Sequence, residues 1–171
     1  MKKTIIACVV FMAFSLSAAF AKASSVSVQI VQNNPGQEKV WATSEFFEQS
    51  MIDYFFDAGR IVSNSPICIA SDDDEKNRKA LKAALIENND GGMDVLVRVE
   101  LFFKKSKSAA PDVPMLGNID KVEWKIYDVV TGLESLGGES VPGKVTSSND
   151  NEQGIAKFAS MVAKKVSSSL E

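Results

Sequence analysis

The chain has 171 residues, a hydrophobic fraction of 45% and a formal net charge of −3 at pH 7. This length suits one domain with a sizeable core, and the acidic balance excludes the non-specific nucleic-acid binding that a basic surface supports. The sequence contains no histidine, which removes the usual general base, the histidine triads of hydrolases and all histidine-ligated metal sites.

The first residues have the three parts of a secretory signal peptide. Lys2 and Lys3 precede an apolar stretch that ends in the small-residue pattern of residues 19–21. We therefore expect residues 1–21 to be removed after export from a bacterial cytoplasm. The mature domain, residues 22–171, would then lie in the periplasm or outside the cell.

Three alternatives to this cleavage remain open. Signal cleavage after Ala23 also fits the small-residue rule. An uncleaved membrane anchor is disfavoured because the second half of the apolar stretch is small and serine-rich. Lipidation of Cys8 is disfavoured because the apolar stretch continues beyond this cysteine.

Cleavage after Ala21 would change the charge and the cysteine content of the chain. Removal of Lys2 and Lys3 takes the formal charge from −3 to −5. Cys68 is then the one remaining cysteine, so an internal disulfide is impossible and the fold depends on its hydrophobic core. Because Cys68 lies in an apolar run, we expect a buried and unreactive thiol.

The mature sequence begins with a predicted strand and a predicted helix. Apolar and polar residues alternate from Val26, and the Asn-Asn-Pro-Gly sequence at 33–36 stops this strand. Ser44 is the expected N-cap of the helix that follows, and Gly59 suits the position after its end.

A second strand and a second helix come next. Residues 60–69 predict a short strand in which Pro66 either ends the strand or lies on a sheet edge. Ser71 or Asp72 is the expected cap of the second helix, and the glycines at 91–92 stop it.

Residues 93–103 give the clearest strand pattern. One predicted face is continuously apolar and should contact helices, whereas the other is mixed and partly exposed to water. The apolar face carries Val95, Val97, Val99 and Leu101, and the mixed face carries Leu96, Arg98, Glu100 and Phe102. Residues 104–118 then predict a mobile loop.

A hairpin and a final helix complete the prediction. Residues 122–130 alternate as a strand, Thr131 and Gly132 form the turn, and residues 133–141 return with either a weak point or a bulge at the glycines 137–138. The apolar stripe of residues 155–166 predicts an amphipathic helix. The fold class is therefore α/β, in the order strand-helix-strand-helix-strand-strand-strand-helix. We expect a mixed sheet of about five strands with three helices mainly on one face.

Acidic residues are the first candidates for a site. The run at residues 72–75 could bind a hard cation, but consecutive acids at a helix start point in different directions and fit capping better. Asp94, Glu100, Glu123 and Asp128 leave a carboxylate hydrolase conceivable. Alternation, however, puts Glu123 on the opposite face from Asp128, and nothing in the sequence fixes the separation of a pair.

Aromatic and basic residues give two weaker candidates. An aromatic platform could stack on sugars or peptides, although aromatics in strands are usually part of the core. Lysines in the long loop could contact an anionic polymer, although an ordinary solvated loop explains them better. These residues are Trp41, Trp124 and Tyr127, and Lys104, Lys105 and Lys107.

Three short motifs resemble those of a group of bacterial envelope domains. They are Asp-Ala-Gly-Arg-Ile-Val at 57–62, Gly-Met-Asp-Val-Leu-Val at 92–97 and Asp-Val-Val-Thr-Gly at 128–132. The group comprises the amino-terminal domain of the TolB translocation protein, the curli-secretion channel lipoprotein and the lipoprotein activators of penicillin-binding proteins. The resemblance implies a non-enzymatic envelope domain that binds another protein and needs no cofactor or metal. Cys8 does not reproduce the lipidated cysteine of the lipoprotein members.

The expected function is therefore that of a periplasmic accessory module that binds an unidentified envelope protein. Addition of a partner strand at a sheet edge is the natural mode. The candidate contact regions are the loop at 104–118 and the tip of the hairpin near Thr131 and Gly132. The candidate contact residues are Trp124, Tyr127, Thr131 and Gly132. The alternative is a small-ligand or glycan-binding protein that uses Trp124 and Tyr127.

Overall fold

The computed structural model describes residues 24–34, 37–104 and 112–171, so the predicted export signal lies outside the described residues. The predicted fold class and order of elements are confirmed. The elements are β1 (Ser25–Asn33), α1 (Ala42–Asp57), β2 (Ile61–Ile69), α2 (Asp74–Asp90), β3 (Val95–Phe103), the 3-10 turn η1 (Leu116–Asn118), β4 (Ile119–Asp128), β5 (Glu134–Ser140) and α3 (Glu152–Ser169).

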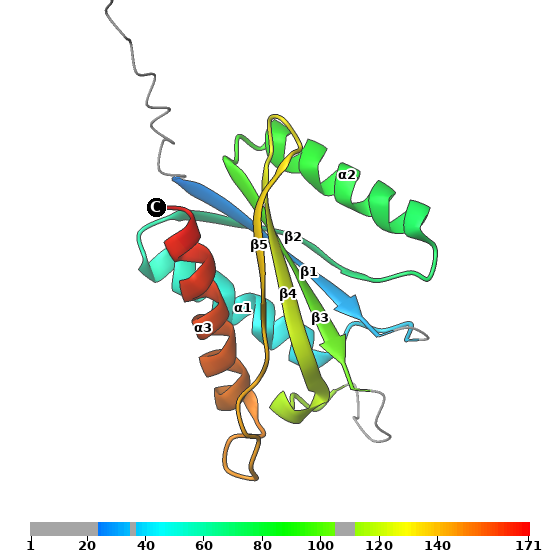
Figure 1. Ribbon diagram of the computed structural model, residues 1–171, viewed down its shortest axis with the longest axis vertical. Coiled ribbons are helices and arrows are strands. Elements are labelled where there is room, and N and C mark those ends of the chain that lie inside the picture. Colours follow the sequence, from blue (N-terminus) through cyan, green and yellow to red (C-terminus); the bar gives the residue numbers. More distant parts are fainter. Residues whose placement is uncertain (1–23, 35–36, 105–111) are drawn as a thin grey trace, which may run out of the picture.

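The strands form one mixed sheet in the order β2-β1-β3-β4-β5. β1 pairs in parallel with both β2 and β3, whereas the β3-β4 and β4-β5 pairs are antiparallel. Helices α1 and α3 pack side by side on one face, and α2 lies on the other (Figure 1). Two of the three helices thus share the face that the sequence predicted to contact helices.

Alternation in β3 separates these two faces as predicted. Val97, Val99 and Leu101 are fully buried in the core beneath α1 and α3. The same core contains Phe47 of α1 and the predicted apolar stripe of α3, which runs from Ile155 to Val166. Burial of this apolar surface is the main source of stability for the fold.

The opposite face has a much smaller apolar cluster. Its members are Ala84 of α2, Leu96 of β3, and Tyr127 and Val129 at the end of β4. α2 packs directly on the sheet only at this end of the face, and its first turns stand off from the polar side chains of β3 and β4. We call this side the polar face, and the side beneath α1 and α3 the apolar face.

The structure corrects both predicted helix caps. Ser44 is buried within α1, where its hydroxyl donates to Oε1 of Gln32, and Trp41 occupies the N-cap position. Oε1 of Gln32 also accepts from the Trp41 backbone N–H at 2.8 Å, so β1 supplies the cap that local sequence rules assign to Ser44. In α2 the N-cap is Asp73, whose carboxylate accepts from the backbone N–H of Glu75.

The second strand continues through Pro66 to Ile69, so the proline does not end it. β2 is an edge strand, as the proline indicated. Its pairing with β1 passes from Ser65 opposite Gln29 to Cys68 opposite Val31, so the proline lies in a bulge of two residues against one. A bulge on an edge tolerates proline because no ladder hydrogen bond is lost there.

The hairpin bulge and the long loop also differ from the prediction. The register of β5 shifts at Ser135 and not at the glycine pair. Instead, Gly138 leaves room for the Trp124 indole, because a Cβ atom at this position would lie 2.6 Å from Cζ2 of Trp124. In the loop, residues 105–111 lie outside the described part, whereas Leu116 of η1 is buried in the core.

Candidate functional site

A cavity of about 510 Å³ lies on the polar face, between the first turns of α2 and the sheet. Its wall includes the carboxyl ends of β1 and β2 and the polar side chains of β3 and β4. β1 connects through α1 to β2 on one side, whereas β3 continues to β4 on the other. Neighbouring parallel strands whose connections leave in opposite directions commonly form a ligand crevice at their carboxyl ends.

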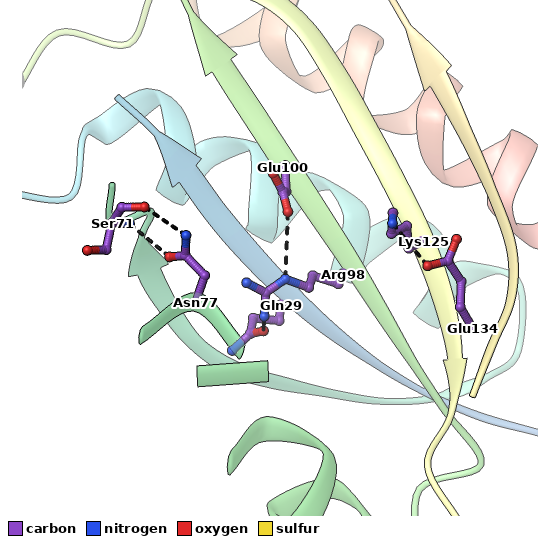
Figure 2. Close-up of polar contacts among 7 residues, drawn as sticks. All are labelled: Gln29, Ser71, Asn77, Arg98, Glu100, Lys125 and Glu134. Carbon is purple, nitrogen blue, oxygen red and sulfur yellow. Dashed lines mark hydrogen bonds and ion pairs between the residues drawn. The ribbon is translucent and has the colours of Figure 1, made fainter. Parts of the chain in front are cut away.

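Arg98 forms the floor of this cavity. Its side chain is only 6% exposed, because alternation in β3 directs it toward the polar face beneath α2. Nη1 donates to Oε1 of Gln29 at 2.9 Å, and Nε lies 3.9 Å from Oε1 of Glu100 (Figure 2). Within the described part of the chain, the other guanidinium N–H groups have no hydrogen-bond partner.

A second cation lies directly across the β3-β4 pair from Arg98. Lys125 occupies the register position opposite Arg98, and its ammonium pairs with Oε2 of Glu134 at 3.0 Å (Figure 2). The hydrogen bond that Lys125 donates to the Glu134 carboxylate raises the pKa of Lys125, so the lysine stays charged. Two cations in direct register repel each other unless anions are close by.

Tyr127 and α2 complete the cavity wall. Burial of Tyr127 raises the pKa of its phenol, which therefore remains protonated at neutral pH. On the helix side, Oδ1 of Asn77 accepts from the Ser71 N–H at 2.8 Å and its Nδ2 donates to the Ser71 carbonyl at 2.7 Å (Figure 2). The carboxylates of Asp72 and Asp74 lie at the exposed rim.

The structure does not bring the predicted aromatic residues together. Trp124 and Tyr127 are 7% and 8% exposed and belong to the apolar clusters on opposite faces of β4, so they do not form one stacking platform. Trp41 packs edge-on against Phe103 with ring centroids 4.9 Å apart. These three aromatics are thus part of the core.

The other two predicted contact residues form the exposed hairpin tip. Thr131 donates its backbone N–H and its hydroxyl to Oδ1 of Asp128, at 2.7 and 2.8 Å. Gly132 has a φ of 68°, which a side chain would disfavour. Partner binding through Trp124, Tyr127, Thr131 and Gly132 stays a prediction.

Two of the four candidate carboxylates hold the backbone in place. Oδ2 of Asp94 accepts from the backbone N–H groups of Ser24 and Ser25 at 2.8 and 2.9 Å, which fixes the start of β1. Asp128 fixes the hairpin turn through Thr131. Hydrogen bonds from the Ser25 and Thr131 backbones lower the pKa of Asp94 and of Asp128, respectively.

The other two carboxylates correct a prediction. Glu100 and Glu123 lie directly opposite each other on the polar face, so the sheet register does fix a carboxylate pair. Each has its own cation, since Glu100 lies near Arg98 and Glu123 pairs with Lys121. Both acids thus belong to a network of alternating charges on this face.

The cysteine and the acidic run have structural surroundings. Cys68 is half-buried on the polar face, less buried than predicted, and burial raises the pKa of its thiol. Among the residues that the structure describes, no group of three histidine, cysteine, aspartate or glutamate side chains is placed to bind a metal ion.

Sequence reasoning missed the cavity itself. Arg98 was visible as a cation within a strand of valines, which is unusual because arginine is rarely buried without a reason. No local pattern, however, indicated that α2 would leave space above it.

A family model described as "Uncharacterised protein" matches residues 25–171. A search of curated proteins found no match. None of the described helices has the length and apolar character needed to cross a membrane.

Several solved structures are similar in fold. A PelC dodecamer from Paraburkholderia phytofirmans, in a variant with a single substitution, matches with 15% identity and a TM-score of 0.49, covering 88% of this chain and 91% of that chain. Lipoprotein GNA1162 from Neisseria meningitidis matches with 13% identity and a TM-score of 0.44, covering 86% and 99%. TolB from Acinetobacter baumannii matches with 12% identity and a TM-score of 0.40, covering 85% of this chain and 28% of that chain. The resemblance to TolB that the motifs predicted is thus found again, and it concerns the fold alone.

Proposed function

We infer that this chain, which belongs to the family matched over residues 25–171, is a non-enzymatic accessory module of the bacterial envelope that binds another protein. The observation that carries the proposal is the contrast between the two edges of the sheet. The β2 edge is interrupted in mid-strand by a proline and a bulge, whereas β5 has no proline and pairs regularly from Leu136 to Ser140, after its register shift at Ser135.

The β5 edge has the features that strand addition needs. β5 is the outermost strand and contains no proline, so its outward backbone groups are available for pairing. Leu133, Leu136 and Val141 are 68%, 48% and 59% exposed along this edge, which is unusual for large apolar side chains. Leu136, which lies within β5, would contact a side chain of an added strand, and Leu133 and Val141 flank the two ends of β5.

The β2 edge is less suited to the same task. Pro66 and the bulge around it interrupt the regular series of backbone groups that a partner strand would need. Natural proteins use these devices to block edge pairing. An extended segment of a partner would therefore select β5.

The roles of the acids support a non-enzymatic function. Asp94 and Asp128 fix backbone segments, and Glu100 and Glu123 are matched by cations. The sequence has no histidine to supply a neutral-pH base. Export to the periplasm rests on the signal pattern of residues 1–21.

Photo-crosslinking in intact envelopes tests the proposal. A photoreactive residue in place of Leu136 should yield a crosslink to one protein, because this position flanks the added strand. The matched control replaces Ile61, which is 68% exposed at the β2 edge and should give no such product. Mass spectrometry of the same preparation should show a chain without residues 1–21.

A charge at the edge supplies the second arm. Leu136→Lys should abolish the crosslinked complex while the thermal unfolding temperature stays unchanged, since the side chain is half exposed. Ile61→Lys is the control and should leave the complex intact. Equal crosslinking from both edges, or a complex that survives Leu136→Lys, would refute strand addition at β5.

A further inference from the structure

We propose that the cavity beneath α2 binds a zwitterionic amino acid or short peptide, with Arg98 as the residue that binds its carboxylate. The inference does not depend on strand addition at β5, because the cavity lies on the polar face of the sheet.

The Arg98 guanidinium uses few of its hydrogen-bond donors within the protein. A guanidinium has five N–H donors, and this one makes a single hydrogen bond, to Gln29, and a long ion pair to Glu100. The side chain is nevertheless buried, with an exposed fraction of only 6%. The N–H groups that face the cavity are therefore free to donate to a ligand acceptor there, and a charge-assisted hydrogen bond to such an acceptor is among the stronger ones.

Two further hydrogen-bond donors line the same cavity as Arg98. Lys125 lies directly opposite Arg98 on β4, and Tyr127 is two residues further along the same face. In the described part of the chain the Tyr127 hydroxyl has no hydrogen-bond partner. The planar Arg98 guanidinium fits a carboxylate, which can accept two parallel hydrogen bonds from the arginine fork, and the Tyr127 phenol is a further donor in the wall of the same cavity.

The balance of positive and negative side chains in the cavity wall favours one class of ligand. Arg78, Arg98 and Lys125 line the cavity, and three carboxylates oppose them, those of Asp72, Asp74 and Glu100. A doubly charged phosphate on Arg98 would meet Glu100, whose Oε1 is only 3.9 Å from Nε. A single carboxylate avoids most of this repulsion, and an ammonium group on the same ligand would be attracted to Asp72 and Asp74 at the rim.

The volume of the cavity limits the size of the ligand. A volume of about 510 Å³ is in the range of small-molecule sites, and it accommodates an amino acid or a short peptide. The mixed charges of the wall exclude an apolar occupant, because burying them against hydrocarbon would leave them unpaired.

Nuclear magnetic resonance titration of the purified chain tests the proposal. The probes are L-alanine, L-alanyl-L-alanine and tri-L-alanine, followed by the dipeptide with its carboxylate amidated, the dipeptide with its amine acetylated, and inorganic phosphate. We expect at least one unmodified probe to shift the resonances of Arg98, Tyr127 and Asn77. Amidation should weaken binding at least about tenfold, as expected for loss of a charge-assisted hydrogen bond. Acetylation and replacement by phosphate should also weaken it.

Variants separate binding from folding. Tyr127→Phe keeps the ring in its cluster and should weaken the titration while the unfolding temperature is retained. Arg98→Gln should abolish it, and Arg98→Lys should restore less than the native affinity because the planar fork is lost. Lys121→Gln is the matched control, since it removes a cation from the same face outside the cavity and should leave binding unchanged.

The titrations can either support or overturn the proposed carboxylate site. Carboxylate-dependent shifts at Arg98 that Tyr127→Phe weakens and Lys121→Gln does not would support the site. Absence of shifts with all three unmodified probes would overturn it, as would equal binding of the amidated dipeptide. Tighter binding of phosphate than of the dipeptide would overturn the zwitterion assignment.

Discussion

The two faces of the sheet are built from the same strands and have opposite chemistry. On the apolar face, α1 and α3 together cover valine, leucine and isoleucine side chains that are almost fully buried. On the polar face, α2 covers only one end and leaves a cavity with Arg98 at its floor. The contrast indicates that stability comes mainly from one face, while the other is free to carry charged groups.

The largest effect should come from the apolar face. Phe47→Ala removes a fully buried ring whose centroid lies 5.9 Å from that of Phe158. We expect a loss of about 3–5 kcal/mol in the free energy of unfolding, because the cavity left behind cannot collapse completely. Urea unfolding followed by circular dichroism measures this loss. Tyr127→Phe is the counterpart on the polar face and should cost less than about 1 kcal/mol, so similar losses for both variants would break the comparison.

A smaller effect should follow when the edge of the apolar face is overfilled. Gly138→Ala places a methyl group 2.6 Å from the Trp124 ring, which is held in the core. The ring or β5 must shift, at a cost of about 1–3 kcal/mol. Gly143→Ala is the control, since its Cβ would meet nothing within 4 Å. Tryptophan fluorescence during thermal unfolding should report a lower midpoint for the first variant and an unchanged midpoint for the second.

The smallest effect, and one that depends on pH, should come from Asp94 on the polar face. Its pKa is lower in the folded chain, chiefly because the Ser25 backbone N–H stabilises the carboxylate. Its contribution to stability is therefore fully present above the unfolded pKa of about 3.9 and is lost as the pH falls through the lower folded pKa. Asp94→Asn should reduce this acid dependence, whereas Phe47→Ala should leave it unchanged. Parallel pH profiles for the native chain and Asp94→Asn would contradict this role of the carboxylate.

The sequence predicts the order of elements well because the spacing of apolar residues indicates which side of each helix or strand faces the protein interior. In α3 the apolar stripe matches the observed burial, and in β3 the alternation matches the division of side chains between the two faces, although Leu96 and Arg98 on the polar face are buried as well. Features that depend on distant residues were not predictable in the same way. The cap of α1 comes from Gln32 in another element, and the room for Trp124 comes from Gly138 across the hairpin. The cavity depends on how much of the sheet α2 covers, which is decided by packing and not by local pattern.

The alternation of side chains along β3 links the apolar core on one face to the cavity on the other. Inserting a single residue early in that strand would rotate every later side chain by half a turn about the strand axis, sending Arg98 and Glu100 under α1 and α3 and the valines into the cavity. Such an insertion would disrupt both the hydrophobic core and the cavity. Length changes in β3 should therefore survive only in steps of two residues.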